Sequence, residues 1–277
     1  MTLPANRALP KFGLLTDPVD PIPDQILQCR RLGFDFVEIG IEEPQATPQI
    51  LMKQNQEIQR SLSESGLFSI GHTAYWVGFG SAHEHVRRGW VEEGKDMIRA
   101  ASQLNIQLLN FHYNARLGRV GVTEESRNTF VQNFTDSMRE LVEFAAPMSI
   151  ELMLENAPPQ GPNPLERIEY FAQILHATPH LKFHLDAPHA FIENGMRGVQ
   201  NYLDLFGDRL VHVHLHDNHG KQDEHLPLGA GKIDFRKVVK ALKAVEYCGT
   251  ITFEVFTSRA DAVRSRESFK KRWEKSS

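Results

Sequence analysis

The sequence has few of the features that mark disulfide-rich, secreted or membrane-spanning proteins. Its 277 residues include two cysteines, Cys29 and Cys248, which are too few for a disulfide framework and form no Cys-x-x-Cys motif. We expect both thiols to be reduced and mostly buried. No apolar run approaches the roughly 18 residues that span a bilayer, and the first residues lack the apolar stretch of a signal peptide. These absences predict a cytoplasmic protein without membrane spans.

A strong charge excess and a low-complexity linker are also missing. The formal net charge is −4 at pH 7, so no global positive field would gather nucleic acid, although a local basic patch stays open. No segment rich in glycine, proline or serine divides the chain. We therefore expect residues 1–277 to form a single domain.

What the chain does contain is a repeated order of strand and helix. Short apolar segments alternate eight times with longer amphipathic segments, which implies a parallel sheet. Eight units in about 270 residues match a closed (β/α)8 TIM barrel, with an open doubly wound sheet as the alternative. The sixth strand is expected to reach His189, and its helix to begin near Val199. The expected strands are 12–17, 36–40, 68–74, 108–114, 150–156, 181–189, 210–217 and 249–256.

Ionisable side chains recur on one face of several expected strands. In the seventh strand, for example, His212, His214 and His216 alternate with apolar residues. Alternate residues of a barrel strand point inward, where a charge is costly unless it is paired or bound to a metal. We expect the deeper inward residues to form a buried polar network, and those near the C-terminal strand ends to form an active site. The deeper residues are Glu151, Lys182, His184 and His212.

Imidazoles and carboxylates gather at the C-terminal strand ends and in the loop after the seventh strand. This mixture suits a transition-metal ion such as Zn²⁺ or Mn²⁺ better than Ca²⁺, which prefers oxygen ligands alone. We therefore expect a divalent metal ion as cofactor. His216 and His219 lie in the same loop region but are not first-choice ligands. The candidate ligands are His72, His112, Glu155, Asp186, His189, His214, Asp223, His225 and Glu254.

The motifs around these ligands make the chain resemble a known family. The segments "IGHTAY", "NFHYN", "LENAP", "LDAPHA", "VHLHDN", "DEHLPLGAG" and "FEVF" follow one another at successive strand ends. In this order they resemble the xylose isomerase-like TIM barrels, also called the AP endonuclease family 2 superfamily. That family includes sugar and sugar-phosphate isomerases and epimerases as well as endonuclease IV. The resemblance covers nearly the whole chain and implies the same barrel fold.

In the isomerase and epimerase branch, the resemblance implies one divalent ion held by four ligands. The matching residues are Glu155, Asp186, His214 and Glu254. Glu155 and Glu254 would also be the catalytic acid/base pair on opposite faces of the substrate carbon. The partner would be a sugar or sugar phosphate, as expected of an enzyme of carbohydrate metabolism. Candidate substrate-binding residues are His189, Glu38, Tyr75, Trp76 and Arg116, although Glu38 could instead hydrogen-bond a metal-binding histidine.

In the endonuclease branch, the resemblance implies three zinc ions on all nine candidate ligands. Three divalent ions on nine ligands with four carboxylates would give the site a net charge of +2, which would attract a phosphodiester. One ion on the four-ligand set would give a net charge of −1, which suits a neutral polyol. The chain departs from that branch, since "HYN" replaces His-Pro-Gly, "DAPH" replaces Asp-Thr-Cys-His, and the loop "IEEPQATP" is acidic where a DNA-binding surface would be basic. A metal-dependent sugar isomerase or epimerase is therefore the leading hypothesis. A zinc-dependent endonuclease is the alternative, and a metal-bearing polyol-binding protein is a third.

Overall fold

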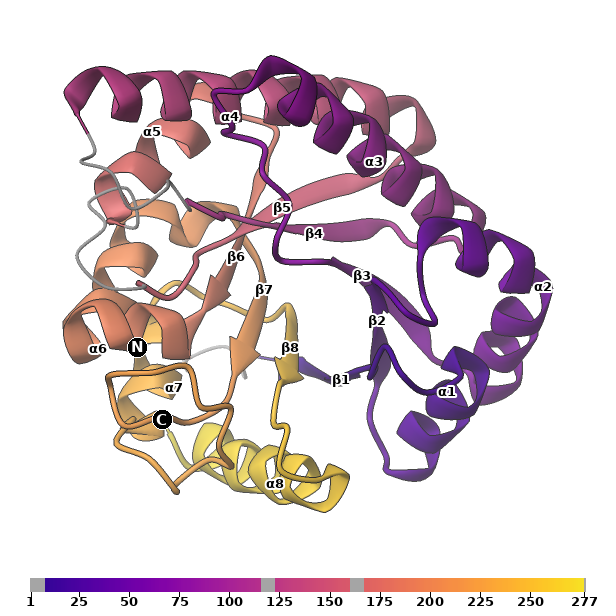
Figure 1. Ribbon diagram of the computed structural model, residues 1–277. Coiled ribbons are helices and arrows are strands. Elements are labelled where there is room, and N and C mark those ends of the chain that lie inside the picture. The colour runs from indigo at the N-terminus through magenta and orange to yellow at the C-terminus, as the bar shows by residue number, and fades with distance from the viewer. Residues whose placement is uncertain (1–7, 116–122, 160–166, 277) are drawn as a thin grey trace, which may run out of the picture.

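The computed structural model describes residues 8–115, 123–159 and 167–276. Eight parallel strands close into a barrel in chain order, and helices surround it (Figure 1). This confirms the predicted (β/α)8 barrel and excludes the open sheet. The strands are β1 (Lys11–Leu15), β2 (Phe36–Ile41), β3 (Phe68–Thr73), β4 (Leu108–His112), β5 (Glu151–Glu155), β6 (Lys182–Asp186), β7 (Leu210–Leu215) and β8 (Thr250–Phe253). The helices are α1 (Ile22–Arg31), α2 (Pro48–Ser65), α3 (Glu84–Gln103), α4 (Glu124–Ala145), η1 (Ala146–Met148), α5 (Ile168–Ala177), α6 (Ala187–Phe206), η3 (Gly207–Arg209), α7 (Phe235–Ala244) and α8 (Arg259–Lys275).

Local sequence signals set the early helix boundaries close to their expected positions. Helix α1 carries Pro23 in its first turn, and the chain leaves it through Gly33, whose φ of 77° favours glycine. Helix α2 follows Thr47, whose hydroxyl accepts a hydrogen bond from the backbone N–H of Ile50. It ends at Gly66 with a φ of 68°.

The sixth strand–helix unit differs from the prediction. Strand β6 ends at Asp186 and α6 begins at Ala187, whereas the sequence pattern predicts a strand as far as His189 and a helix from Val199. The Asp186 carboxylate caps the helix by accepting a 2.6 Å hydrogen bond from the backbone N–H of His189, and Pro188 occupies the first turn. The Asp-Ala-Pro-His stretch is therefore a helix start, and His189 reaches the site from a helix.

The barrel interior is apolar near the N-terminal ends of the strands and polar farther along. Phe36, Ile70 and Met153 form a small buried cluster that is separate from the main core. The main core lies between the strands and the surrounding helices. Beyond the small cluster, inward side chains such as Glu38 and His184 are polar and fully buried. The polar part of the interior thus lies beneath the C-terminal opening of the barrel.

Two members of the expected buried network lie outside it. Glu151 and Lys182 stand at the starts of β5 and β6, with side chains 60% and 35% exposed, and they pair with each other at 3.2 Å. The prediction that they are buried was wrong, because strand alternation indicates the face of a residue but not its depth along the barrel axis. His184 and His212 are fully buried, as expected.

The two cysteines also differ from each other. Cys29 is buried and donates a hydrogen bond to the carbonyl of Phe36, whereas Cys248 is exposed, so the expectation that both are buried was wrong for Cys248. Burial raises the pKa of the Cys29 thiol to about 12. In the part of the chain that the structure describes, no helix combines the length and apolarity of a membrane span.

Candidate metal centre and active site

A cavity of about 540 Å³ opens at the C-terminal end of the barrel. Asp186 and His214 are fully buried behind its wall, where they contact His189 and Glu254 respectively. The nine ligands expected from the sequence therefore gather around one opening. Seven of them line the cavity directly: His72, His112, Glu155, His189, Asp223, His225 and Glu254.

The first group of donors comes from three neighbouring strands. His72 is the penultimate residue of β3, whereas His112 ends β4 and Glu155 ends β5. The Nε2 of His112 lies 3.1 Å from Glu155 Oε2 and 3.2 Å from His72 Nε2. Glu155 Oε2 also accepts a 2.6 Å hydrogen bond from the side-chain amide of Asn110. One carboxylate oxygen and two imidazoles thus converge on one point.

The second group centres on His214 of β7. Its Nε2 donates a 2.9 Å hydrogen bond to Glu38, because a carboxylate only accepts, so Nδ1 is the ring nitrogen that faces Glu254 and Asp186. That Nδ1 lies 3.3 Å from Glu254 Oε2 and 4.0 Å from Asp186 Oδ2. Neither Nδ1 nor Asp186 Oδ2 has a hydrogen-bond partner among the described residues. A lone pair among carboxylate oxygens is repulsive unless a proton or a cation lies between them, so this group fits a divalent cation.

The third group joins helix α6 to the loop between β7 and α7. Asp223 Oδ2 lies 3.1 Å from His189 Nε2 and 3.0 Å from His225 Nε2. The Nδ1 atoms of both histidines donate to backbone carbonyls, His189 to Asn156 at 2.9 Å and His225 to Glu254 at 3.0 Å. This second set of hydrogen bonds fixes each ring so that its Nε2 points at the same carboxylate.

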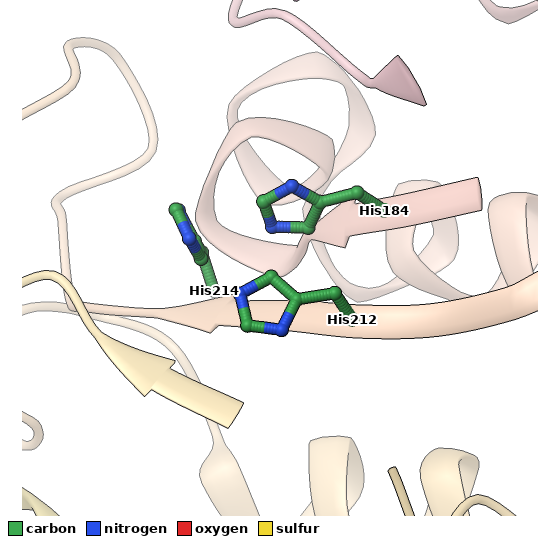
Figure 2. Close-up of side chains that lie close together, drawn as sticks. All are labelled: His184, His212 and His214. Carbon is green, nitrogen blue, oxygen red and sulfur yellow. The ribbon is translucent and has the colours of Figure 1, made fainter. Parts of the chain in front are cut away.

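A buried polar network supports these donors from inside the barrel. His184 of β6 and His212 and His214 of β7 turn their rings toward one another (Figure 2). The Glu38 carboxylate accepts hydrogen bonds from the Nε2 atoms of both His212 and His214. His184 Nδ1 donates a 3.0 Å hydrogen bond to the side-chain oxygen Oδ1 of Asn110. The side-chain nitrogen of Asn110 in turn donates to Glu155. The network therefore positions one donor from β5 and one from β7.

The electrostatics of the site keep its carboxylates ionised. Burial alone would raise the pKa of Glu254, but the positive charges of His225 and His214 outweigh it and lower the pKa to about 2. Burial likewise opposes ionisation of Glu155, yet His112 and His184 hold its pKa well below the usual range. Both glutamates are thus proton acceptors at neutral pH.

The expected substrate-binding residues fall into different places. Tyr75 lines the cavity, and Trp76 lines an adjoining groove. His189 is in the cavity wall, whereas Glu38 is fully buried below it and bonded to two histidines, which corresponds to the second of its two expected roles. Arg116 lies outside the described residues.

Sequence reasoning missed four residues that the structure brings to the site. Glu42 lines the cavity, and Asn110 binds Glu155 from below. His216 is fully buried between Asp186 and Asp223, although it was not a first-choice ligand. Asp217 binds the backbone of the ligand-bearing loop. His216 alternates along the chain with His212 and His214, and this pattern could have predicted that it points inward. No such periodic pattern marks Glu42 or Asp217.

Similar proteins point to one family. A family model described as "Xylose isomerase-like TIM barrel" matches residues 26–272. An uncharacterised protein of Methanocaldococcus jannaschii is 33% identical over 196 residues, which cover 69% of this chain. The L-ribulose 3-epimerase of Methylomonas sp. (strain DH-1) is 27% identical over 247 residues, which cover 84% of this chain and 78% of that enzyme. This chain spans 64% of the first protein's length and 63% of a second relative from the same archaeon. The crystal structure of a D-tagatose 3-epimerase-like protein superposes with a TM-score of 0.84 at 25% identity, covering 96% of this chain and 98% of that one. The chain belongs to the xylose isomerase-like TIM barrel family.

Proposed function

We propose that this protein is a divalent-metal-dependent sugar epimerase or isomerase in which Glu155 and Glu254 transfer protons at a carbon beside a carbonyl group. The observation that carries the proposal is the position of the two glutamates: Glu155 ends β5, Glu254 directly follows β8, and both line one cavity. These strands are three apart in the closed ring of eight, so the two carboxylates approach one cavity from different sides. The L-ribulose 3-epimerase among the relatives supports the same class of reaction.

The principal metal site in this proposal consists of Glu155, Asp186, His214 and Glu254. His214 Nδ1 and Asp186 Oδ2 support it, because neither makes a hydrogen bond within the described part of the chain, and buried polar atoms in this state are costly in the absence of a cation. A bound Zn²⁺ or Mn²⁺ would polarise the substrate carbonyl and acidify the neighbouring C–H group.

The two glutamates then divide the proton transfer. One ionised carboxylate takes the proton from the substrate carbon on its own side of the cavity. The other takes up a proton from solvent as the substrate binds and gives it to the carbon from the opposite side, which inverts the carbon. The two carboxyl groups have then exchanged protonation states. Asn110 keeps Glu155 in place through its 2.6 Å hydrogen bond, so the base does not swing away as its charge changes.

Glutamine substitutions at the two positions test this mechanism. Glu155→Gln and Glu254→Gln should each lower the turnover number by about 10²–10⁴-fold on a responsive ketose, because the amide cannot accept the proton. Glu151→Gln is the matched control, since Glu151 shares β5 with Glu155 but is exposed at the far end of the barrel. NMR in D₂O should show one deuterium incorporated at the inverted carbon. Full activity in Glu155→Gln with unchanged metal content would refute the mechanism, and ligand binding without turnover in the unmodified protein would favour the polyol-binding alternative.

The cavity wall favours a neutral sugar over a sugar phosphate. Among the described residues, four carboxylates line the cavity, whereas Lys221 is the single lysine or arginine in that lining. The four are Glu42, Glu155, Asp223 and Glu254. Burial raises the pKa of Glu42, which suits a carboxyl group that meets substrate hydroxyls. A panel of paired ketoses and ketose phosphates should therefore give higher kcat/KM for the neutral member of each pair.

The endonuclease alternative keeps one observation in its favour, namely that all nine expected ligands meet around one opening. The acidic lining opposes it, because a DNA-binding surface needs cationic side chains at the phosphates. An assay with abasic duplex DNA decides between the two. Nicking at a rate that exceeds sugar turnover would favour the endonuclease.

A further inference from the structure

His216 is a buried histidine at the edge of the candidate metal centre, and its ring nitrogens make no hydrogen bond with the described residues. It follows β7 directly, is fully buried, and neither ring nitrogen has a hydrogen-bond partner among the described residues. Its Nε2 lies 3.4 Å from Asp223 Oδ1 and 3.5 Å from Asp186 Oδ2, neither with hydrogen-bond geometry. A buried polar group in this state is costly unless something absent from the protein chain satisfies it.

The surroundings of His216 provide three further donors. Asp223 stands 3.1 Å from His189 Nε2 and 3.0 Å from His225 Nε2 through one oxygen, while its other oxygen faces His216. The donor atoms of His216, Asp223 and His225 all lie within 4.8 Å of one another. Donors around a tetrahedral zinc ion with bonds of about 2.0–2.1 Å are about 3.3 Å apart, which is close to these separations.

The orientation of His225 agrees with a ligand role. Its ring is stacked between His216 and Phe256, with ring centroids 4.1 Å apart on each side. Its backbone has a φ of 47°, a left-handed conformation that costs free energy in a residue other than glycine. The stack and the Nδ1 hydrogen bond to Glu254 hold Nε2 toward Asp223.

We propose that His216 is the fourth ligand of a second divalent ion, held with His189, Asp223 and His225 in what we term the loop metal site. Three imidazoles and one carboxylate suit Zn²⁺. Three protein ligands would leave a position open for water or substrate, as in catalytic zinc sites, whereas four fill a tetrahedral shell. With His216 included, the ion is structural: it fastens the β7–α7 loop to α6 and the end of β7. A filled loop metal site is therefore no sign of phosphodiesterase chemistry.

Metal content and thermal stability together test this site. His216→Leu should lose about one zinc per chain on the zinc-reloaded protein, with the zinc dissociation constant of that site raised at least about 100-fold. His219→Leu is the matched control, since His219 lies in the same loop, half exposed and bonded to Glu224, and should keep every ion. Glu254→Gln should also keep the loop ion, which separates this test from the principal metal site.

The sign of the stability change distinguishes a ligand from a packing residue. In chelator-treated protein, His216→Leu should melt at the same temperature as the unmodified protein or higher, because it removes an unsatisfied buried polar group. In zinc-loaded protein it should melt lower. Zinc content and affinity equal to the unmodified protein would overturn the proposal, as would destabilisation of equal size in both states.

A second route does not depend on the folding of His216→Leu. X-ray absorption on the Glu254→Gln variant, in which the principal site is blocked and His216 is retained, should report a zinc ion with three imidazole nitrogens and one oxygen. Asp223→Asn, at a partly exposed loop position, should lose that signal. A zinc ion with fewer than three imidazole ligands in Glu254→Gln would exclude His216 as a ligand.

Discussion

At the scale of single residues, the position of Glu38 explains how a charge can be buried inside the barrel without exposure to the cavity. Its carboxylate is fully buried, accepts hydrogen bonds from His212 and His214, and keeps a pKa well below its usual value because the charges of those histidines outweigh the effect of burial. The proton that it holds on His214 Nε2 decides which nitrogen of that ring faces Glu254 and Asp186. Glu38 therefore positions His214 and, through it, the proposed principal metal site.

Replacing Glu38 by glutamine tests this role. Glu38→Gln keeps the shape of the side chain and one acceptor oxygen but removes its charge, so the hydrogen bond that orients His214 is weakened and can be reversed by the amide NH₂. We expect the dissociation constant of the principal ion to rise about 10–100-fold, the effect typical of removing a hydrogen-bond partner of a metal ligand. Isothermal titration with Mn²⁺ measures this change, and Glu43→Gln, on the exposed loop after β2, is the control. An unaltered affinity would contradict the positioning role.

At the scale of elements, the loop between β7 and α7 is held by a single carboxylate. Asp217 Oδ2 accepts backbone hydrogen bonds from Gly229 at 2.8 Å and Gly231 at 2.9 Å, while Oδ1 accepts from Asn218 at 2.9 Å and Ile233 at 3.1 Å. The backbones of Asp217 and Leu226 also exchange two hydrogen bonds. The loop that carries Asp223 and His225 is thus closed at its base before any ion binds.

The substitution Asp217→Asn measures how much this carboxylate contributes. Its amide group must face either the Gly229 and Gly231 N–H groups or those of Asn218 and Ile233, so two donors lose their acceptor. We expect the free energy of unfolding to fall by about 2–4 kcal/mol, since hydrogen bonds to charged groups contribute about 1.5–3 kcal/mol each. Chemical denaturation measures the change, with Asp208→Asn on the exposed surface as control. A change below that of the control would show that the loop does not depend on Asp217.

The elements also show where sequence reasoning succeeds and where it stops. Eight periodic apolar segments were enough to predict the barrel, since each strand needs a helix to cover its outer face. Motif order was enough to predict that the nine candidate ligands lie around one opening. The depth of Glu151 and Lys182 depended on the strand register, which alternation does not specify. The contact between His216 and Asp223 depended on a loop folding back over the end of β7, and no local pattern encodes that contact.

At the scale of the whole molecule, the candidate metal centre links stability to pH. In metal-free protein, burial opposes protonation of His189 and His225, but nearby carboxylates outweigh it and raise their pKa values to about 10 and about 9. In the unfolded chain both would titrate near about 6.5. Because the folded-state values are higher, the stability that these protonated histidines contribute is fully present below about pH 6.5 and is lost as the pH rises toward 9–10.

Metal binding should reverse this dependence. A metal ion binds only the neutral form of an imidazole and therefore displaces its proton. For each proton displaced, the apparent affinity for the ion rises about tenfold per pH unit between pH 6.5 and the folded-state pKa. We therefore expect the melting temperature of chelator-treated protein to fall between pH 6.5 and 8.5, while the increase in melting temperature on adding zinc grows. Differential scanning calorimetry at matched ionic strength measures both trends. His225→Asn should flatten them, because one of the two raised histidines is gone. A chelator-treated protein that became more stable with rising pH would contradict this explanation. In that case, protonation of His189 and His225 would not stabilise the metal-free protein.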